Sequence, residues 1–291
     1  MIRAPLQAPT PLSVTYSDGY RAVGRAWIRA EAGGERTGIL YLHGIQSHGG
    51  WYEWSASLLA RRGAVWMPDR RGSGRNVTAR GDVANPDRWL VDLDELVAKF
   101  RQECGAEAVD VVGVSWGGKL ALAWSLRRPA GLRRLLLVAP GLFPRVDLPL
   151  SVRMRIAAAL LAAPTRHFPI PLNDAALFTE SADGQAFIRD DSIKLETATA
   201  RFLYNSRRLD QRIARAKPAT IAAPVTALLA GGDRIVNTDL IRSRLIELCA
   251  SRPEIVMFPG ASHSLEFEPG DAFQAALEAW RDGIPSATDR C

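Results

Sequence analysis

The chain has 291 residues, a length that fits one large α/β domain with an insertion better than two small domains. Hydrophobic residues make up 47% and charged residues 23% of the sequence, which excludes global disorder. The formal net charge is +6, but arginine pairs such as Arg61-Arg62 and Arg207-Arg208 are dispersed rather than gathered in a block. We therefore expect a solvated basic surface and no nucleic-acid partner.

Cysteine usage and the start of the chain bear on the cellular context. Cys104, Cys249 and Cys291 are odd in number and lack C-x-x-C spacing, so neither a disulfide framework nor a zinc site is indicated. Met1 to Val14 contains three prolines and no apolar run of signal-peptide length. No stretch reaches the roughly eighteen apolar residues of a membrane span. We expect a cytoplasmic protein with no stable membrane insertion.

The first elements in chain order are predicted to be strands. Ser13 to Tyr16 and Tyr20 to Ala30 flank Ser17-Asp18-Gly19, a turn composition typical of a β-hairpin. Thr37 to Leu42 is almost continuously apolar, as in a strand covered on both faces. The next expected elements are a polar loop from His43 to Gly50, a helix near Trp51 to Arg61, a buried strand at 64–67 and an amphipathic helix from Pro86 to Cys104.

A serine between two glycines is the most informative motif. The β-branched run Val109 to Val112 leads into Gly113-Val114-Ser115-Trp116-Gly117, and a helix-forming segment follows. A strand, G-x-S-x-G and a helix in this order are typical of a nucleophile elbow, in which Ser115 occupies a strained turn. Glycines on either side let the strand and helix approach closely. The alternative is a glycine-rich turn with a buried serine.

The second half of the chain continues the alternation of strands and helices. Strands are predicted at 133–138, 224–230 and 254–258, and helices at 238–248 and 270–282. This order predicts a mostly parallel central sheet flanked by helices. The interval from Gly141 to about Lys217 is too long for one loop and lacks strand-like alternation. We expect a core domain of residues 1–140 and 218–291, with a helical cap inserted at 141–217.

The cap contains an alanine-rich segment with a scattered apolar pattern. Leu148 to Ala163 includes Met154, Ile156, Leu160 and Leu161, and it is predicted to form an amphipathic helix. The apolar face of this helix either roofs an acyl pocket or serves as a plain structural support.

A serine nucleophile needs a base and a group that orients the base. His263 follows the last predicted strand, on a loop at the carboxyl ends of the strands, and is the candidate base. Asp233, in Gly231-Gly232-Asp233, follows the strand at 224–230 and lies between nucleophile and base in chain order, so it is the candidate acid. The alternatives are a histidine that bonds only locally and an aspartate that caps the next helix.

Backbone donors for a developing oxyanion are expected at two places. The N–H groups of Trp116, directly after the nucleophile, and of Ile45, in the loop after the strand at 37–42, are the candidates. His43 and Gly44 form the start of this loop, and His43 is expected to brace it. His48 either lines the pocket entrance or stabilises the loop, so we list His43, Gly44 and His48 as candidate substrate-binding residues.

The ordered motifs together resemble the α/β-hydrolase superfamily. They are His43-Gly44, Asp69-Arg70-Arg71-Gly72-Ser73-Gly74, the elbow, Gly231-Gly232-Asp233 and His263. The loop His43-Gly44-Ile45-Gln46-Ser47-His48, followed by Trp51-Tyr52-Glu53, resembles the monoacylglycerol lipase and lysophospholipase branch, which is similar to serine aminopeptidase S33. That branch commonly has methionine and histidine where this chain has Trp116 and Val114, so its pocket shape does not carry over.

The motifs predict a serine hydrolase that cleaves carboxylic esters with an apolar acyl or aryl group through an acyl-enzyme on Ser115. No metal or organic cofactor is required, and the expected partner is a small-molecule ester. An acyltransferase, or a hydrolase of thioesters, amides or carbon–carbon bonds, would use the same three residues. A non-catalytic small-molecule receptor of the same fold is the alternative from another class.

Overall fold

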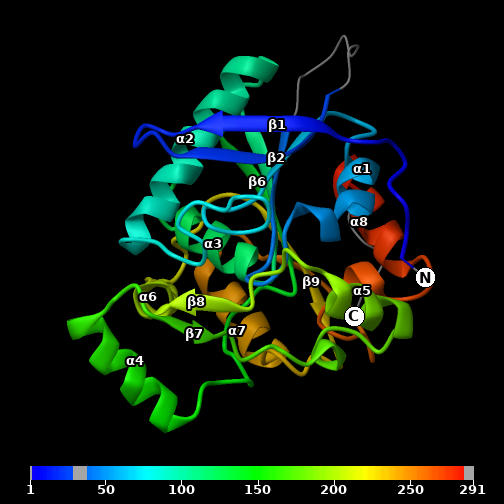
Figure 1. Ribbon diagram of the computed structural model, residues 1–291. Helices are drawn as coiled ribbons and strands as arrows, with labels where there is room; N and C mark the ends of the chain where they lie inside the picture. The colour runs from blue at the N-terminus through cyan, green and yellow to red at the C-terminus, as the bar shows by residue number, and fades with distance from the viewer. Residues whose placement is uncertain (1, 29–37, 285–291) are drawn as a thin grey trace.

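The computed structural model describes residues 2–28 and 38–284, and an eight-stranded sheet forms its centre (Figure 1). The strand order is β1-β2-β4-β3-β5-β6-β9-β10. β2 pairs antiparallel with β1 and β4, and all other neighbours are parallel. The strands are β1 (Thr10–Thr15), β2 (Arg21–Trp27), β3 (Gly38–Leu42), β4 (Ala64–Pro68), β5 (Val109–Val114), β6 (Leu132–Val138), β9 (Val225–Ala230) and β10 (Glu254–Phe258). The predicted α/β fold with a mostly parallel sheet is confirmed.

The strand boundaries agree with the sequence to within a few residues. Parts of two predicted strands, Tyr20 to Ala30 and Thr37 to Leu42, extend into 29–37 and lie outside the described residues, as does Cys291. The expected hairpin turn is present, with Gly19 at a φ of 78°. Every residue of β3 and β5 is buried, as expected for central strands covered on both faces.

Helices cover both faces of the sheet. Figure 1 shows α1 (Glu53–Leu59) and α8 (Ala272–Asp282) on one side, and α2 (Pro86–Cys104) and α3 (Trp116–Ser125) on the other. The helix predicted near Trp51 to Arg61 is divided, because a short 3₁₀ turn, η1 (Gly49–Trp51), precedes α1. The remaining core helices are α7 (Thr238–Leu248) and the 3₁₀ turn η3 (Leu265–Phe267).

Local sequence explains the limits of α2. The Asn85 side chain accepts a hydrogen bond from the Arg88 N–H, and Pro86 is the first helical residue, a position where its missing donor costs nothing. Gly105 ends the helix in the left-handed conformation, with a φ of 62°. The apolar side of α2, which includes Trp89 and Phe100, is buried.

The segment between β6 and β9 is mostly helical and also contains a small antiparallel sheet, and its assignment as a separate cap stays a prediction. Strands of three residues are too short for alternation to reveal them. The elements are α4 (Leu150–Ala162), β7 (His167–Pro169), η2 (Ala175–Leu177), α5 (Ala182–Asp190), β8 (Thr197–Thr199) and α6 (Ala200–Arg215). In Figure 1, α4 projects away from the sheet at the lower left.

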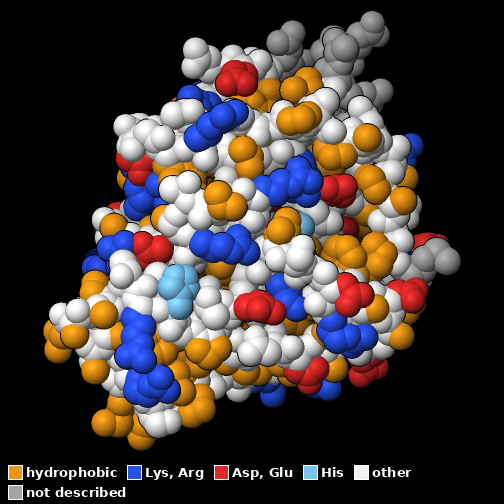
Figure 2. All heavy atoms as spheres, in the orientation of Figure 1, with side chains coloured by type: hydrophobic (Ala, Val, Ile, Leu, Met, Phe, Trp, Pro, Cys, Tyr) orange, Lys and Arg blue, Asp and Glu red, His pale blue; other side chains and the backbone are white. Residues whose placement is uncertain are grey.

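The faces of α4 differ in part from expectation. Ile156 is buried and Leu160 packs beside it, as expected for inward-facing residues. Met154 and Leu161, in contrast, are 66% and 92% exposed, so they do not roof a pocket. Figure 2 shows hydrophobic side chains gathered at this corner of the molecule. No helix in the described ranges has the length and hydropathy needed to cross a bilayer.

One buried carboxyl in the core has few partners. Glu266, in η3, is 8% exposed, and its Oε1 accepts a hydrogen bond of 3.1 Å from the Ser55 N–H. Oε2 has no hydrogen-bond partner among the described residues. Burial raises the pKa of this carboxyl to about 7, so its ionised form is disfavoured in the folded protein.

We expect Glu266 to make stability depend on pH. Its folded pKa of about 7 lies above the unfolded value, so the unfolded chain releases the proton first and stability falls as pH rises from about 4.5 to 7. Glu266→Gln should remove about 2–3 kcal/mol of this fall, measured by urea unfolding at pH 5 and 8. Glu103→Gln, at an exposed position of α2, is the control. An unchanged difference between the two pH values in Glu266→Gln would contradict this assignment.

Candidate active site

Ser115 lies at the sharp turn between β5 and α3. Its backbone has a φ of 50° and a ψ of −118°, a conformation that costs a non-glycine residue about 1–3 kcal/mol. Hydrogen bonds on both sides hold it. The Ser115 N–H donates to the Val138 carbonyl at 2.9 Å, and the Ser115 carbonyl accepts from the Gly141 N–H at 2.7 Å. The hydroxyl is thus fixed at the carboxyl end of the sheet.

The glycines around the serine are required by close packing. A Cβ on Gly113 would lie 2.7 Å from the Gly118 Cα, and one on Gly117 would lie 2.3 Å from the Leu42 carbonyl oxygen. Neither distance is tolerable for a real side chain. Glycine is therefore needed at both positions because the strand and the helix approach the turn closely, as the sequence indicated.

His263 and Asp233 reach Ser115 from separate loops. His263 Nε2 lies 2.8 Å from Ser115 Oγ, and His263 Nδ1 lies 2.7 Å from Asp233 Oδ2. The other carboxylate oxygen of Asp233 accepts the N–H groups of Ile235 and Val236 at 2.8 and 3.0 Å. Because an ionised carboxylate only accepts, Nδ1 carries the proton and Nε2 is left to accept from the serine hydroxyl.

Contacts between the two loops set this alignment. The Gly232 N–H donates to the Ala261 carbonyl at 2.9 Å, and a Cβ on Gly232 would lie 2.9 Å from the Gly260 carbonyl oxygen. On the other side of the histidine, the Ser264 N–H donates to the Phe178 carbonyl, and the Phe178 ring packs edge-on against His263. Sequence analysis did not find Phe178, because nothing local marks its proximity.

The two candidate oxyanion donors belong to segments next to Ser115 in the structure. Trp116 is the first residue of α3, so its N–H has no acceptor within the helix. The loop that carries Ile45 passes beside Ser115, since a Cβ on Gly44 would lie 3.4 Å from the Ser115 Cβ. The Trp116 indole is held by a further hydrogen bond of 2.8 Å, which Nε1 donates to Ser206 Oγ on α6.

His43 occupies a bracing position in this loop. Its ring is buried, Nδ1 lies 2.8 Å from the Gly44 carbonyl oxygen, and Nε2 accepts the Arg70 N–H at 2.8 Å. Burial and the nearby Arg70 guanidinium hold the pKa of His43 well below its ordinary value, so the ring is neutral. Both ring nitrogens are engaged within the protein. Contact of His43 or Gly44 with substrate stays a prediction.

His48 connects the same loop to the inserted segment. Its Nδ1 accepts the Gly50 N–H at 3.0 Å, which leaves Nε2 to donate to Asp191 Oδ2 at 3.1 Å. Asp191, directly after α5, also accepts from Trp51 Nε1 at 2.7 Å. These bonds lower the pKa of Asp191 to about 2 against the opposing effect of burial. His48 stabilises the loop in this structure, and a direct role in binding substrate stays a prediction.

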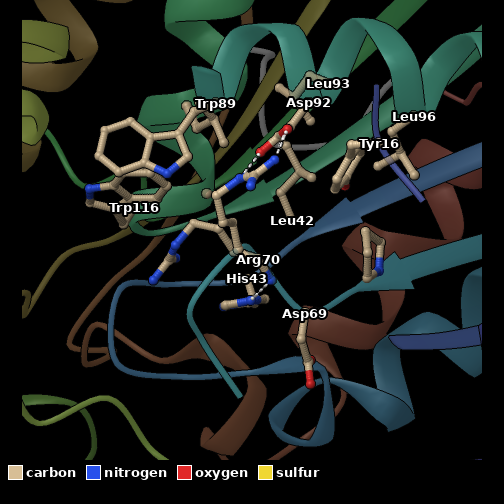
Figure 3. A pocket seen from close by; sticks show the side chains of 14 residues that line it. Tyr16, Leu42, His43, Asp69, Arg70, Trp89, Asp92, Leu93, Leu96 and Trp116 are labelled. Carbon is tan, nitrogen blue, oxygen red and sulfur yellow. Dashed lines mark hydrogen bonds and ion pairs between the residues drawn. The ribbon is translucent and has the colours of Figure 1, made fainter. Parts of the chain in front are cut away.

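Two hollows lie near these residues. A groove of about 360 Å³ runs between α4 and α6, with Ile156, Leu160 and Leu203 in its walls and Ser206 in its lining. A smaller cavity of about 40 Å³ lies beside the start of the loop after β3, where Figure 3 shows His43, Arg70 and Trp116 close together.

Comparison with known proteins decides the family. A family model described as serine aminopeptidase, S33, matches residues 34–270. The chain belongs to the serine aminopeptidase S33 family. This membership makes the chain a member of a hydrolase family and confirms the resemblance to α/β-hydrolases of the monoacylglycerol lipase branch.

Individual proteins that are similar to this chain support the family assignment. A monoacylglycerol lipase from Mycolicibacterium smegmatis is 25% identical over 243 residues, which cover 79% of this chain and 82% of the relative. A soluble variant of the monoglyceride lipase from Saccharomyces cerevisiae has a TM-score of 0.79 at 17% identity and covers 97% of this chain and 96% of its own. A carboxyl esterase from Bacillus coagulans has a TM-score of 0.76 at 14% identity, with 96% and 100% covered. The two structures show a shared fold.

We expect Asp191→Asn to destabilise the protein by about 2 kcal/mol at pH 7, because its pKa is lowered from 3.8 to about 2 on folding. This stability is present above pH 4 and is lost as pH falls through the folded pKa, so the difference between variant and wild type should shrink below about pH 4. Urea unfolding at several pH values measures it. The neighbouring exposed Asp190→Asn is the control, and equal destabilisation by both substitutions would refute the prediction.

Proposed function

We propose that this S33 family member is a serine hydrolase of carboxylic esters, with Ser115 as nucleophile, His263 as base and Asp233 as the orienting acid. The observation that carries the proposal is a chain of two hydrogen bonds that links Asp233 Oδ2, the His263 imidazole and Ser115 Oγ, with distances of 2.7 and 2.8 Å. The site geometry matches what acyl transfer through a covalent intermediate needs.

The proposed reaction has two steps, acylation of Ser115 and hydrolysis of the acyl-enzyme. Ser115 Oγ forms a bond to the ester carbonyl carbon while its proton passes to His263 Nε2, and the oxyanion accepts the N–H groups of Ile45 and Trp116. The tetrahedral intermediate breaks its bond to the alcohol oxygen, which leaves with the proton from Nε2. Water attacks the acyl-enzyme in the same way, and the acid is released. Asp233 stabilises the imidazolium in both halves.

We assign substrate selection to residues 141–217, acting as a cap. The groove between α4 and α6 has Ile156, Leu160 and Leu203 in its lining, together with charged residues such as Arg153 and Asp210. Its lining residue Ser206 accepts from the Trp116 indole next to the nucleophile. An apolar acyl or aryl group fits such a lining. The monoacylglycerol lipase from Mycolicibacterium smegmatis supports an ester of this kind as substrate.

Amide hydrolysis is the second candidate, and one comparison favours it. A proline iminopeptidase from Clostridium botulinum is 30% identical over 125 residues, which cover 42% of this chain and 39% of the relative. The same three residues serve either reaction. The ester proposal has the broader support, because the monoacylglycerol lipase match covers 79% of the chain. Comparing p-nitrophenyl esters, monoacylglycerols and prolyl anilides separates the two.

Ser115→Ala and His263→Ala should each lower kcat for p-nitrophenyl butyrate by about four orders of magnitude or more, because the members of such a relay act as a unit. A fluorophosphonate probe should label the wild type on Ser115 and leave Ser115→Ala unlabelled, as read by mass spectrometry. His167→Ala, at an exposed histidine that begins β7, is the control. Near-normal turnover by folded Ser115→Ala would disprove the proposed function.

Leu160→Trp should narrow the groove and discriminate against long acyl chains. We expect kcat/KM for p-nitrophenyl decanoate to fall by about 10-fold or more, since one misplaced methylene group is already worth about 10- to 200-fold. The acetate ester should change by less than about twofold. Leu161→Trp alters the exposed neighbour and should leave both esters unaffected. Equal effects of Leu160→Trp on the two esters would exclude the groove as the acyl site.

A further inference from the structure

Arg70 lies in the loop after β4. It is bound at three successive residues to the loop from His43 to Gly50, which we call the oxyanion loop. Its backbone N–H donates to His43 Nε2 at 2.8 Å. Its guanidinium donates from Nη1 to the Gly44 carbonyl and from Nη2 to the Ile45 carbonyl, both at 3.0 Å. A single side chain therefore fixes the orientation of two consecutive peptide groups beside Ser115.

The guanidinium carries a charge that no carboxylate cancels at close range. In the described part of the chain, Arg70 has no carboxylate within ion-pair distance. The Asp69 carboxylate accepts hydrogen bonds from the N–H groups of Gly49 and Arg75 at 2.8 and 2.9 Å. The guanidinium carbon lies 4.5 Å from the centre of the Trp116 ring, which stabilises the cation. Burial lowers the pKa of Arg70 to about 9, which still leaves it charged at neutral pH.

The neighbouring arginine shows that this arrangement is particular to Arg70. Arg71 donates to both carboxylate oxygens of Asp92 at 2.9 and 2.8 Å, so its charge is balanced. Figure 3 shows Asp92 on the opposite side of the small cavity from His43. Of the two adjacent arginines, Arg70 is the one with no ion pair in the described part of the chain, and the Asp69 carboxylate acts on its charge only from a longer distance.

The peptide group that Arg70 contacts is the one that supplies the proposed oxyanion donor. The Gly44 carbonyl and the Ile45 N–H belong to one peptide unit, so a donor on the oxygen polarises the N–H. Two donors converge on that oxygen, Arg70 Nη1 at 3.0 Å and His43 Nδ1 at 2.8 Å. Chained hydrogen bonds strengthen one another, and a charged donor roughly doubles the effect of a neutral one.

We infer that Arg70 is a positioning residue for the oxyanion hole: its guanidinium orients and polarises the Gly44–Ile45 peptide so that the Ile45 N–H stabilises the tetrahedral intermediate. The inference rests on the proposed function. Arg70 does not touch the substrate. It acts on the transition state more than on the bound ester, because the negative charge on the carbonyl oxygen develops only as Ser115 attacks.

Two substitutions of Arg70 test the inference. Arg70→Met removes the charge, and Arg70→Lys keeps a cation that cannot reach both carbonyls as a fork. We expect Arg70→Met to lower kcat for p-nitrophenyl butyrate by about 10- to 100-fold, since outright loss of an oxyanion donor costs about 100- to 1,000-fold. Arg70→Lys should lose less. KM and the pH profile of kcat/KM should stay within error of the wild type.

A pair of inhibitors separates positioning from a merely structural role. An alkyl trifluoromethyl ketone adds to Ser115 and places an oxyanion in the hole, whereas the matching methyl ketone binds without adding. The trifluoromethyl ketone should bind Arg70→Met about 10- to 100-fold more weakly, in step with kcat, and the methyl ketone about equally. Arg244→Met is the control, because Arg244 is a buried arginine that caps the carbonyls of Ile213, Ala214 and Ala216 away from the site. It should lose stability and keep its kcat.

Three outcomes overturn the inference. The first is that both ketones lose affinity for Arg70→Met by the same factor. The second is that the kcat of both Arg70 variants stays within twofold of the wild type. The third is that the pH profile of kcat/KM shifts together with kcat. If Arg70→Met does not fold, the same comparison in Arg70→Lys decides. In each case the Ser115→Ala enzyme is still inactive, so the proposed function stands. A Ser115→Ala enzyme that keeps its activity overturns the proposed function and this inference together.

Discussion

The backbone of Ser115 is the constraint on which the rest of the site depends. A positive φ at a residue with a side chain is maintained only where the surroundings hold it from several sides. Here the end of β6, the Gly141 N–H and the first turn of α3 hold it, and glycines make room for them. The parallel sheet brings these groups together, because the carboxyl ends of neighbouring strands meet at one edge. The position of Ser115, the proposed nucleophile, is therefore a property of the whole sheet.

The inserted segment is bonded to several parts of this site. Asp191 binds His48 in the loop after β3, Phe178 contacts His263, and Ser206 accepts from the Trp116 indole. On α3, the buried Lys119 also forms an ion pair of 2.8 Å with Asp210 of α6. Each contact joins the segment to α3, to the loop after β3 or to the loop that carries His263. Movement of this segment would therefore disturb the geometry around Ser115 as well as access to it.

Sequence indicated the elbow and its two partners because their signals are local. Glycines at 113 and 117 mark a turn, and Asp233 and His263 each follow a predicted strand in the expected order. Asp191 gave no such signal, since it is 143 residues from His48 and only the folded segment brings them together. Met154 and Leu161 show another limit. Periodicity tells which residues of a helix share a face, but not whether that face meets a neighbour or solvent.

The proposed reaction separates charge, and each charge that develops has a fixed opposite charge behind it. His263 becomes cationic while Asp233 holds its far nitrogen at 2.7 Å. On the other side of Ser115 the carbonyl oxygen becomes anionic, and Arg70 holds the far end of the Ile45 peptide at 3.0 Å. In both cases the charge acts through one hydrogen-bonded group and does not contact the substrate. Because these groups are bound before the ester arrives, they need little reorganisation when the charge appears, which is the condition under which electrostatic stabilisation lowers a barrier most.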